Sequence, residues 1–361
     1  MADDPLLLLR DAIDGVDLKL QQLLEERAEL VHQVGEIKRA ESDAPVFYRP
    51  EREAQVLRLV KERNNSRLSD ETVARIFREI MSACLALEQP TQIAFLGPEG
   101  TFTHQAVLKQ FGHAAVGRPM GSIDQVFREV EAAAVNYGIV PVENSTEGVV
   151  SHTLDTFMQS PLMICGEVEL RIHHHLMVGE HTRRDRITRI YSHQQTLAQC
   201  RKWLDAHMPG VERVAVSSNS AAAKRLKDEW NAAAIAGEMA AEIYGLDILH
   251  NNIEDEPDNT TRFIVIGRDA VPPSGNDKTS LMVGGKNRPG LLHRVLAPFR
   301  EAGINLTRLE SRPAKHSKWN YVFFIDFEGH RDDPHVAPVL EALQSDDMEL
   351  RFLGSYPKAV L

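Results

Sequence analysis

The spacing of apolar positions changes along the chain, and in the first segment it is the spacing of a helix. From Pro5 to about Glu88 they return every three or four residues, which is typical of amphipathic helices. Breaks at Pro50 and Asn64–Ser66, followed by Ser69 as an N-cap, predict one long helix, one shorter helix and a third of about 18 residues. Because a long helix must cover its apolar stripe, we expect this segment to dimerise.

The second segment has the pattern of an α/β domain. After Gln92, short apolar runs alternate with helix-like stretches as far as Gly267, and about 175 residues are enough for two lobes. The expected strands are Ile93–Leu96, Tyr137–Val142, Leu162–Leu170, Val214–Ser217, Ala232–Ala236 and Phe263–Ile266.

The third segment begins after the linker Val271–Asp277, which contains two prolines and a glycine. Its strand–helix–strand–strand–helix–strand order predicts a ferredoxin-like α+β fold. The expected helices start at Pro289 and Pro334, and the expected strands are Thr279–Val283, Ile304–Arg312, Tyr321–Phe327 and Glu349–Gly354. The predicted domains are residues 1–90 (all-helical), 92–269 (α/β) and 278–361 (ferredoxin-like).

Composition narrows the class of protein. Hydrophobic residues make up 43% and charged residues 26%, which fits a globular chain. The net charge of −11 argues against nucleic-acid binding through a general basic field, although a few local cations suffice for an anionic substrate. No apolar run reaches the roughly 20 residues of a membrane span, and Leu6–Leu9 lacks the features of a signal peptide. Three distant cysteines without a CxxC pair fit a reducing compartment, so we expect a cytoplasmic protein.

Two cations, Arg27 and Lys38, fall in the apolar stripe of the first helix. They lie roughly 16 Å apart along one face, a spacing that suits a small dianion held between them. The alternative is that they extend to the edge of the bundle or pair with acidic residues. On the third helix, Cys84 and Glu88 share a face with Phe77, although Cys84 by itself fits a small core residue.

The second segment contains four polar clusters, and three of them lie at an end of an expected strand. They are Gly97–Thr103, Glu143–Gly148, Ser192–Gln195 with Gln199, and Asn259–Phe263. Polar groups at strand ends are typical of a site in an α/β protein, although each cluster alone also fits a capped loop.

Two further patterns carry less weight. His173–His175 suggests a metal site, but neighbours in an extended segment face opposite ways, and no carboxylate or cysteine cluster accompanies them. Ser192 and His193 are adjacent, and adjacent residues rarely form the hydrogen bond of a nucleophile and its base. We therefore expect no metal and no cofactor.

The helical segment resembles the all-helical chorismate mutase domain. The matching runs are Leu7–Lys38, Glu51–Glu53 and Ile76–Glu88. The resemblance implies an active site inside a helical dimer, with Arg10 contributed by the partner chain. Rearrangement of chorismate to prephenate needs no nucleophile, because the site only has to hold two carboxylates in a compact conformer and stabilise the breaking ether bond.

The resemblance also implies roles for single residues. Lys38 and Glu88 flank the ether oxygen, and Glu53 orients a substrate hydroxyl. Glu88 stands where some members have Gln, so we expect it to act protonated and mutase activity to fall as it ionises. Arg49 replaces the usual Asp, which leaves one hydroxyl contact in question. The implied catalytic residues are Arg10, Arg27, Lys38, Glu53 and Glu88, and the implied substrate-binding residues are Arg49, Arg52 and Cys84.

The motifs Gly-Pro-x-Gly-Thr-Phe, Pro-Val-Glu-Asn-Ser and Thr-Arg-Phe together resemble prephenate dehydratase, whose fold is similar to a two-lobed type II periplasmic binding protein. Its reaction removes water and carbon dioxide as an aromatic ring forms. The resemblance implies Thr261 as the acid or polarising group, Arg262 as a carboxylate anchor and Phe263 as a wall against the ring. The other implied site residues are Thr101, Asn144, Ser145, Thr146, Ser192 and Gln199.

Two motifs stand out in the third segment. The first, Asn287–Leu292, lies at the first strand–helix junction, and the second, Glu310–Pro313, lies near the end of the second strand. Proline at a helix start and glycine in a turn also fit ordinary structure. Together the motifs resemble the ACT domain of feedback-regulated dehydratases, where they form a phenylalanine pocket between subunits. The implied residues are Asn287, Pro289, Gly290, Leu291, Leu292, Glu310, Ser311, Arg312 and Pro313.

The three resemblances predict an enzyme of phenylalanine biosynthesis that converts chorismate to prephenate and then to phenylpyruvate, and that L-phenylalanine inhibits. The expected partners are these small molecules and at least one more copy of the chain, with no nucleic acid and no membrane. One alternative is a monofunctional dehydratase with an inactive mutase domain, because Arg49 breaks the pattern. Another is a non-catalytic amino-acid sensor, which is disfavoured because the Thr261 cluster and the mutase cations are present.

Overall fold

The computed structural model describes residues 5–42, 46–146, 148–285, 288–313, 321–344 and 348–361. The chain begins with the predicted helices α1 (Pro5–Glu41), α2 (Pro50–Glu62) and α3 (Asp70–Glu88). Pro50 lies in the first turn of α2, where a missing N–H costs nothing. Ser69 caps α3, because its hydroxyl accepts a hydrogen bond from the Thr72 amide at 3.2 Å.

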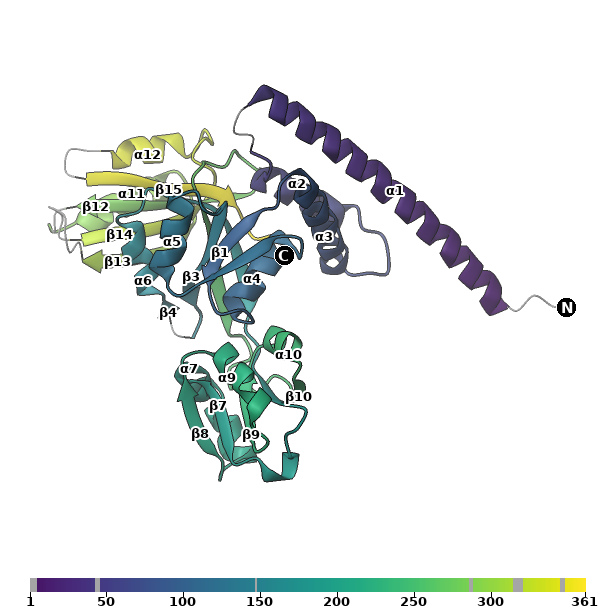
Figure 1. Ribbon diagram of the computed structural model, residues 1–361. Coiled ribbons are helices and arrows are strands. Elements are labelled where there is room, and N and C mark those ends of the chain that lie inside the picture. The colour runs from purple at the N-terminus through teal and green to yellow at the C-terminus, as the bar shows by residue number, and fades with distance from the viewer. Residues whose placement is uncertain (1–4, 43–45, 147, 286–287, 314–320, 345–347) are drawn as a thin grey trace.

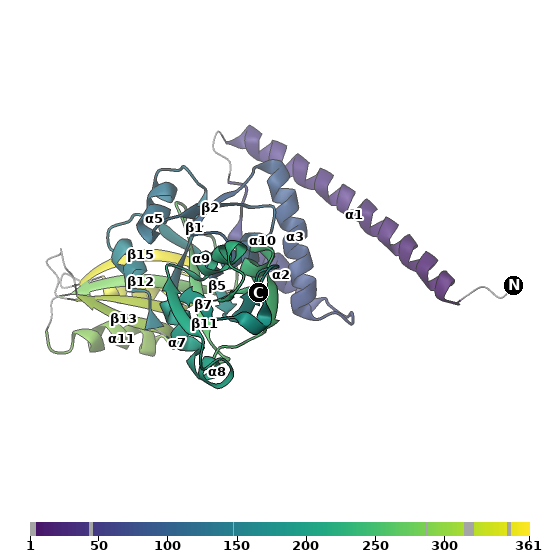
Figure 2. The ribbon, with the colours of Figure 1, turned by 60° about the horizontal axis from the view of Figure 1, so that its bottom comes forward.

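α1 extends away from the rest of the molecule as a single rod (Figures 1 and 2). Its C-terminal half contacts α3, and Gly35 is the one buried residue among those described in this helix. The apolar stripe predicted from the sequence is left uncovered by this chain. The exposed apolar side chains of α1 are Leu6, Leu7, Leu8, Leu9, Ile13, Val16, Leu18, Leu20, Leu23, Leu24, Leu30, Val34 and Ile37.

The first lobe of the middle segment is built on a mixed sheet of order β2-β1-β3-β11-β5, with β4 paired to β3. Its strands are β1 (Gln92–Leu96), β2 (Val116–Met120), β3 (Tyr137–Asn144), β4 (Gly148–Val149), β5 (Met163–Arg171) and β11 (Thr260–Gly267). Its helices are α4 (Phe102–Phe111), α5 (Ile123–Glu131) and α6 (Ser151–Phe157). β11 returns from the second lobe and lies antiparallel between β3 and β5.

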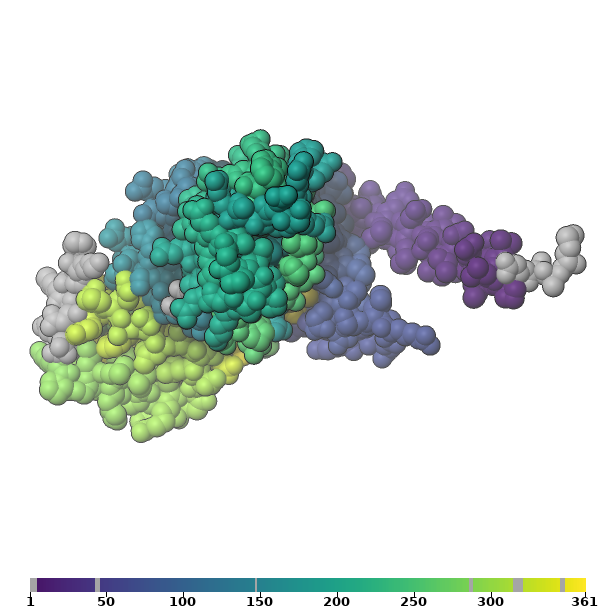
Figure 3. All heavy atoms as spheres, turned by 90° about the horizontal axis from the view of Figure 1, so that it is seen from below, coloured from purple at the N-terminus to yellow at the C-terminus, as the bar shows by residue number. Residues whose placement is uncertain are grey.

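The second lobe has a sheet of order β10-β6-β9-β7-β8. Its strands are β6 (His175–Val178), β7 (Arg189–His193), β8 (Glu212–Val216), β9 (Ala232–Ala236) and β10 (Asp247–His250). Its helices are α7 (Gln194–Gln199), α8 (Arg201–His207), α9 (Asn219–Arg225) and α10 (Glu238–Tyr244), with short 3₁₀ turns at Arg184–Arg186 and Leu226–Asp228. Seen from below, this lobe lies in front of the first and α1 projects to one side (Figure 3). The predicted two-lobed α/β architecture is confirmed.

The sequence analysis did not indicate β2, β4, β6, β7 and β10, and a local reason is identifiable for each of these strands except β7. β2 carries Gly117 and Pro119 and lies at the edge of its sheet, so it contains no apolar run. β4 has two residues, and β10 is half polar. β6 begins at His175, inside a run of histidines that masks its apolar continuation.

The last segment is an α+β unit with a sheet of order β13-β14-β12-β15, as predicted for a ferredoxin-like fold. Its elements are β12 (Asp277–Gly285), α11 (Leu291–Glu301), β13 (Leu306–Pro313), β14 (Tyr321–Glu328), α12 (Ala337–Leu343) and β15 (Met348–Pro357). α11 starts after Pro289 because Gly290 occupies the N-cap with a φ of 83°, a left-handed conformation that glycine adopts without strain.

This unit and the first lobe share one hydrophobic core. Phe127 of α5 and Phe157 of α6 belong to the same buried cluster as Phe324, Leu353 and Tyr356 of the last segment. The sheet of the last segment is therefore fixed against the lobe that carries β11. In the described parts of the chain, no helix is both long and apolar enough to cross a bilayer.

Candidate functional site

Arg27, Cys84 and Glu88 form one cluster between α1 and α3. Arg27 Nη1 donates to Cys84 Sγ at 2.9 Å, and Cys84 is buried. Gly35 permits the close approach of the two helices, because a Cβ there would lie 2.9 Å from Glu88 Oε1. Glu88 Oε1 is buried without a hydrogen-bond partner among the described residues. An unpaired buried oxygen costs about 1–3 kcal/mol, so this atom is suited to meet a donor or a proton when substrate binds.

Lys38 and Arg39 both lie beside Phe47, in the connection to α2. Lys38 Nζ donates to the Phe47 carbonyl oxygen at 3.3 Å and lies 5.5 Å from the ring centroid. Arg39 Nη2 donates to the Glu88 carbonyl oxygen at 2.7 Å. Arg39 is a cation that we did not single out from the sequence. Its spacing of four residues from Gly35 places it on the same helix face, and that spacing is the feature that could have identified it.

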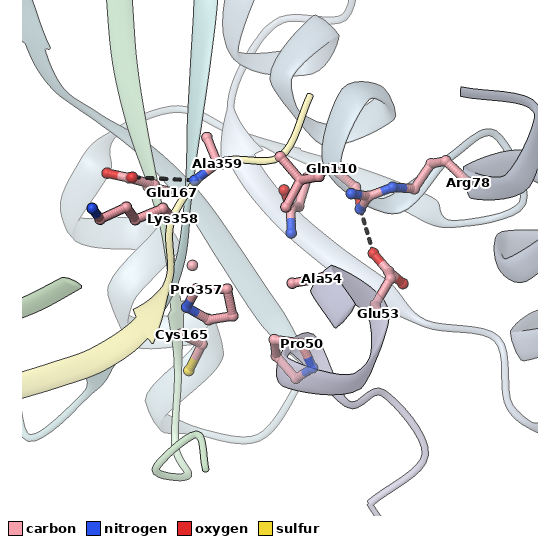
Figure 4. Close-up of a pocket in the computed structure, with 12 residues that line it drawn as sticks. Pro50, Glu53, Ala54, Arg78, Gln110, Cys165, Glu167, Pro357, Lys358 and Ala359 are labelled. Atoms are coloured by element: carbon pink, nitrogen blue, oxygen red, sulfur yellow. Dashed lines mark hydrogen bonds and ion pairs between the residues drawn. The ribbon is translucent and has the colours of Figure 1, made fainter. Parts of the chain in front are cut away.

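Glu53 does not join this cluster, which corrects its predicted role. Its carboxylate pairs with Arg78 of α3, and Arg78 also donates to the Gln110 carbonyl oxygen of α4. In Figure 4, Glu53 and Arg78 point toward each other beside Gln110, where the helical segment meets the first lobe. Burial raises the pKa of Glu53, although Arg78 opposes the shift. Because a buried charge that loses its partner is costly, Glu53 is committed to this junction and not to a substrate hydroxyl.

The other predicted mutase residues also lie outside the cluster. Arg49 Nη1 lies 3.8 Å from Glu51 Oε1, and Arg52 is exposed on α2. Arg10 precedes Arg27 by 17 residues on the same helix. This separation is about 25 Å along the axis, so Arg10 cannot reach the cluster of its own chain.

Thr261 and Asn144 form a cross-strand pair where β3 ends and β11 begins. Asn144 Nδ2 donates to Thr261 Oγ1 at 2.7 Å and to Asn259 Oδ1 at 2.9 Å. Since the Thr261 oxygen accepts this bond, its own hydroxyl hydrogen is left for a second partner. The pair lies next to the two crossings between the lobes, which are hydrogen-bonded to each other through Ile172 and Asn259 at 2.8 Å.

Three more predicted residues have defined places. Ser145 and Thr146 lie beside this pair, and Thr101 lies at the start of α4. Ser145 and Thr146 are exposed, and Ser145 Oγ accepts from the Thr260 amide at 2.9 Å. The Thr146 amide donates to Asn144 Oδ1 at 3.0 Å, which orients the amide group of Asn144. Thr101 caps α4, accepting from the His104 amide at 3.3 Å.

Ser192 is fully buried, which corrects its predicted contact with substrate. Its hydroxyl lies 2.9 Å from Asn219 Oδ1 and 2.8 Å from the Ile235 carbonyl oxygen, so it fixes the end of β7 within its sheet. Gln199 Oε1 lies 2.9 Å from His174 Nε2. Because an amide oxygen only accepts, Nε2 carries the hydrogen.

His174 Nδ1 is therefore an acceptor, and it is buried without a partner among the described residues. Burial lowers the pKa of His174, so its ring is neutral. His173, its neighbour, is bound to Glu254 Oε1 at 2.8 Å. The residues that the structure describes contain no group of three metal-ligating side chains close enough to hold an ion. His174 entered the sequence analysis only as a metal ligand, and its pairing with Gln199 could not be read from the sequence.

Arg262 and Phe263 also differ from their predicted roles. Arg262 points to the opposite side of β11 from Thr261, as successive residues of a strand do, and it lies 2.9 Å from Glu167 Oε2. Phe263 is 2% exposed and packs in the core with Phe95. Neither side chain is available as a carboxylate anchor or a wall against the substrate ring.

Gly290, Leu291, Leu292 and Ser311 line an open pocket of about 350 Å³ on the last segment. Its other lining residues are Arg288, His293, Tyr321 and Phe323.

The remaining residues of the two predicted motifs do not line this pocket. Arg312 turns away to α6, where its Nη2 lies 2.6 Å from Asp155 Oδ1, which corrects its predicted place in the pocket. Glu310 is half-buried, and Pro289 and Pro313 are exposed. Asn287 falls outside the described residues.

Comparison with known proteins identifies all three parts. The family model of type II chorismate mutase matches residues 9–89, that of prephenate dehydratase matches residues 93–271, and that of the ACT domain matches residues 279–344. The bifunctional chorismate mutase/prephenate dehydratase of Pseudomonas aeruginosa is 61% identical over 365 residues, covering 100% of both chains. The chain belongs to this bifunctional family. The corresponding enzyme of Stutzerimonas stutzeri is 60% identical over 99% of both chains.

One solved structure is similar to about three quarters of the chain. The crystal structure of prephenate dehydratase from Arthrobacter aurescens, in complex with L-Phe, is 36% identical with a TM-score of 0.68. The match covers 74% of this chain and 90% of the other. The α1–α3 segment lies in the region that the chorismate mutase model matches.

Proposed function

We propose that this enzyme rearranges chorismate between paired copies of its helical segment, dehydrates prephenate at the Thr261–Asn144 pair, and is inhibited by L-phenylalanine bound to its ACT domain. The observation that carries the proposal is the 2.7 Å hydrogen bond between Asn144 and Thr261 at the meeting point of the two lobes. The proposed domain limits remain residues 1–90, 92–269 and 278–361.

In the mutase reaction no residue forms a covalent bond to the substrate. Arg27 and Lys38 bind the two carboxylates with Arg10 of a second copy, and protonated Glu88 donates to the ether oxygen as its C–O bond breaks. The apolar face of α1 is uncovered, and the helical rise puts Arg10 about 25 Å from Arg27. Both features support a homodimer or a higher homo-oligomer. Arg39, which binds the Glu88 carbonyl oxygen, supports the carboxyl end of α3 in this arrangement.

In the dehydratase reaction Thr261 donates its hydroxyl hydrogen toward the leaving hydroxyl of prephenate. The C–O bond breaks as the electrons of the ring carboxylate's C–C bond complete the aromatic ring and carbon dioxide departs. The hydroxyl takes the Thr261 proton and leaves as water, and the Thr261 oxygen regains a proton from solvent. Asn144 holds the Thr261 oxygen so that the hydrogen points outward. Thr101, Ser145, Thr146 and Gln199 complete the polar lining around the substrate.

Phenylalanine inhibition is supported by the open pocket of about 350 Å³, which suits a single amino acid, and by the L-Phe complex of the Arthrobacter relative. Inhibition requires that phenylalanine bind the less active form more tightly. The three cysteines are buried and free of disulfides, which supports a place in the reducing cytoplasm.

The decisive experiment supplies the purified protein with chorismate alone and follows prephenate and phenylpyruvate with time. Both products in succession, and slower phenylpyruvate formation with millimolar phenylalanine, are the expected result. Untouched chorismate with added prephenate still converted would leave the helical segment as a dimerisation element. Equal dehydration rates with and without phenylalanine would refute the proposed inhibition.

A further inference from the structure

Four charged residues alternate in sign across the boundary between the first lobe and the ACT domain. In the lobe, Arg262 of β11 is the cross-strand partner of Glu143 of β3. In the ACT domain, Arg308 of β13 is the cross-strand partner of Asp326 of β14. Arg262 Nη1 lies 2.5 Å from Asp326 Oδ2, and Arg308 Nε lies 3.5 Å from Glu143 Oε2. We call Glu143, Arg262, Arg308 and Asp326 the boundary quartet.

The boundary quartet is one register step from the reacting pair. The cross-strand partners Thr261–Asn144 directly adjoin the partners Arg262–Glu143 on the same two strands. Because neighbouring strand residues face opposite sides, Thr261 and Asn144 are turned away from the ACT domain while Arg262 and Glu143 turn toward it. A shift of the ACT domain that moves Arg262 and Glu143 therefore moves the backbone that holds Thr261 and Asn144.

Three members of the quartet are buried well enough to transmit such a shift. The side chains of Arg262, Arg308 and Asp326 are 11%, 9% and 5% exposed. Arg262 Nη2 also donates to the Tyr356 hydroxyl at 2.8 Å, and Asp326 Oδ1 accepts from Ser280 at 2.6 Å. Although burial opposes its ionisation, Arg262 and Arg308 hold the pKa of Asp326 below its usual range. Separating buried charges of this kind is costly, so the two sheets move together.

Glu167 anchors the same guanidinium from within the lobe. Its carboxylate binds Arg262, Lys278 of β12 and the Ala359 amide, the last at 3.2 Å. Figure 4 shows the Glu167–Ala359 hydrogen bond, which draws the end of the chain into this boundary. Arg262 thus has fixed partners in both domains, and none of them lies on the Thr261 side of the strand.

We propose that the boundary quartet makes the ACT domain a positioning element of the dehydratase site, and that it carries the effect of phenylalanine to Thr261. The inference rests on the proposed roles of Thr261 and of phenylalanine. Arg262 is a positioning residue in this scheme, since it acts on substrate only through the strand that carries Thr261.

The test compares Asp326→Asn with the unmutated full-length enzyme. We expect kcat for prephenate dehydration to fall with KM little changed, and phenylalanine inhibition to weaken by about 10-fold, within the usual range of coupling between two sites. Binding of phenylalanine, measured by calorimetry, and the mutase rate should persist. Glu143→Gln, which weakens the longer ion pair at a side chain that is 42% exposed, should produce the same pattern more weakly.

The matched control is Arg351→Lys. Arg351 crosses the same boundary, donating to the carbonyl oxygens of Met158 and Ser160, and both of these acceptors lie outside β3 and β11. It should leave dehydration and inhibition unchanged. The inference is overturned if Asp326→Asn and Glu143→Gln dehydrate prephenate and respond to phenylalanine as the unmutated enzyme does, or if Arg351→Lys reproduces their defect. An unmutated enzyme that ignores phenylalanine would instead refute the proposed inhibition and, with it, the transmitted effect.

Discussion

The mutase and dehydratase parts of this chain differ in how much of a site one copy supplies. In the dehydratase part, sheet register brings Thr261 and Asn144 within 2.7 Å of each other without help from another chain. In the mutase part, α1 and α3 bring Arg27 to Cys84, while Arg10 remains far along an uncovered helix. A cross-strand pair is fixed by the fold of one domain, whereas a long lone helix acquires its function through assembly.

Replacing Thr261 by Ala should have the largest effect. The change removes the proposed donor to the leaving hydroxyl, and such a loss typically costs about 10²- to 10⁴-fold in rate. Prephenate conversion should collapse while chorismate conversion by the same sample persists. Thr260→Ala, one residue earlier on β11, serves as the control and should stay near the normal rate. Loss of both activities in Thr261→Ala would point to misfolding and not to a catalytic role.

Mixing two inactive dehydratase variants should not restore prephenate turnover. Thr261→Ala and Asn144→Ala both disable a site that lies within one chain, so a mixture that exchanges subunits gains nothing. Prephenate turnover of the mixture should equal the average of the two variants. Any marked recovery would mean that Thr261 and Asn144 act from different chains, and the contrast with the mutase would fail.

Mixing should instead rescue the mutase. Arg10→Ala and Arg27→Ala should each lower chorismate rearrangement by about 10²- to 10³-fold, the scale for removing one electrostatic contact. In a two-fold dimer mixed at equal amounts, about a quarter of the sites combine intact Arg10 and Arg27, so about a quarter of the activity should return. A mixture as inactive as its components would place both arginines in sites of one chain.

The fold followed from the sequence wherever one pattern dominated. Ser69, Pro50 and the three- to four-residue period defined the helices, and alternating apolar runs defined the buried strands. β2 escaped because Gly117 and Pro119 give an edge strand no apolar run. Edge strands gain their stability from pairing with a neighbour, and pairing cannot be seen in a local pattern.

The sequence predicted part of what the fold brings together here, but not the directions of the side chains. The motifs identified Thr261 and Asn144, which the fold does bring together. They also nominated Arg262, which turns to the ACT domain, and Glu53, which pairs with Arg78 at a domain junction. Both errors have one cause: contacts between domains depend on how the domains pack, and one-dimensional spacing contains no information about that packing.

Glu88→Gln tests whether the mutase site needs a proton that the dehydratase site does not. Glu88 Oε1 is buried without a partner among the described residues, and it can donate to the ether oxygen only when protonated. The amide of Glu88→Gln can donate at any pH, so any pH dependence of chorismate rearrangement in the unmutated enzyme should flatten in this variant. Glu36→Gln, at an exposed position on α1, should keep the slope of the unmutated enzyme. An unchanged slope in Glu88→Gln would remove Glu88 from the reaction.

The smallest effect concerns the pH dependence of stability in the dehydratase part. Burial lowers the pKa of His174 below its value of 6.5 in the unfolded chain, so the unfolded state takes up a proton first as the solution is acidified. Stability associated with His174 is therefore complete above pH 6.5 and declines below it. The thermal midpoint of the unmutated enzyme should drop from pH 7.5 to pH 5.5 by more than that of His174→Gln, while His181→Gln, at an exposed position, should follow the unmutated enzyme. Equal drops of the thermal midpoint in all three proteins would mean that the His174 ring is exposed to solvent. The dehydratase part would then be no better shielded from water than the mutase cluster.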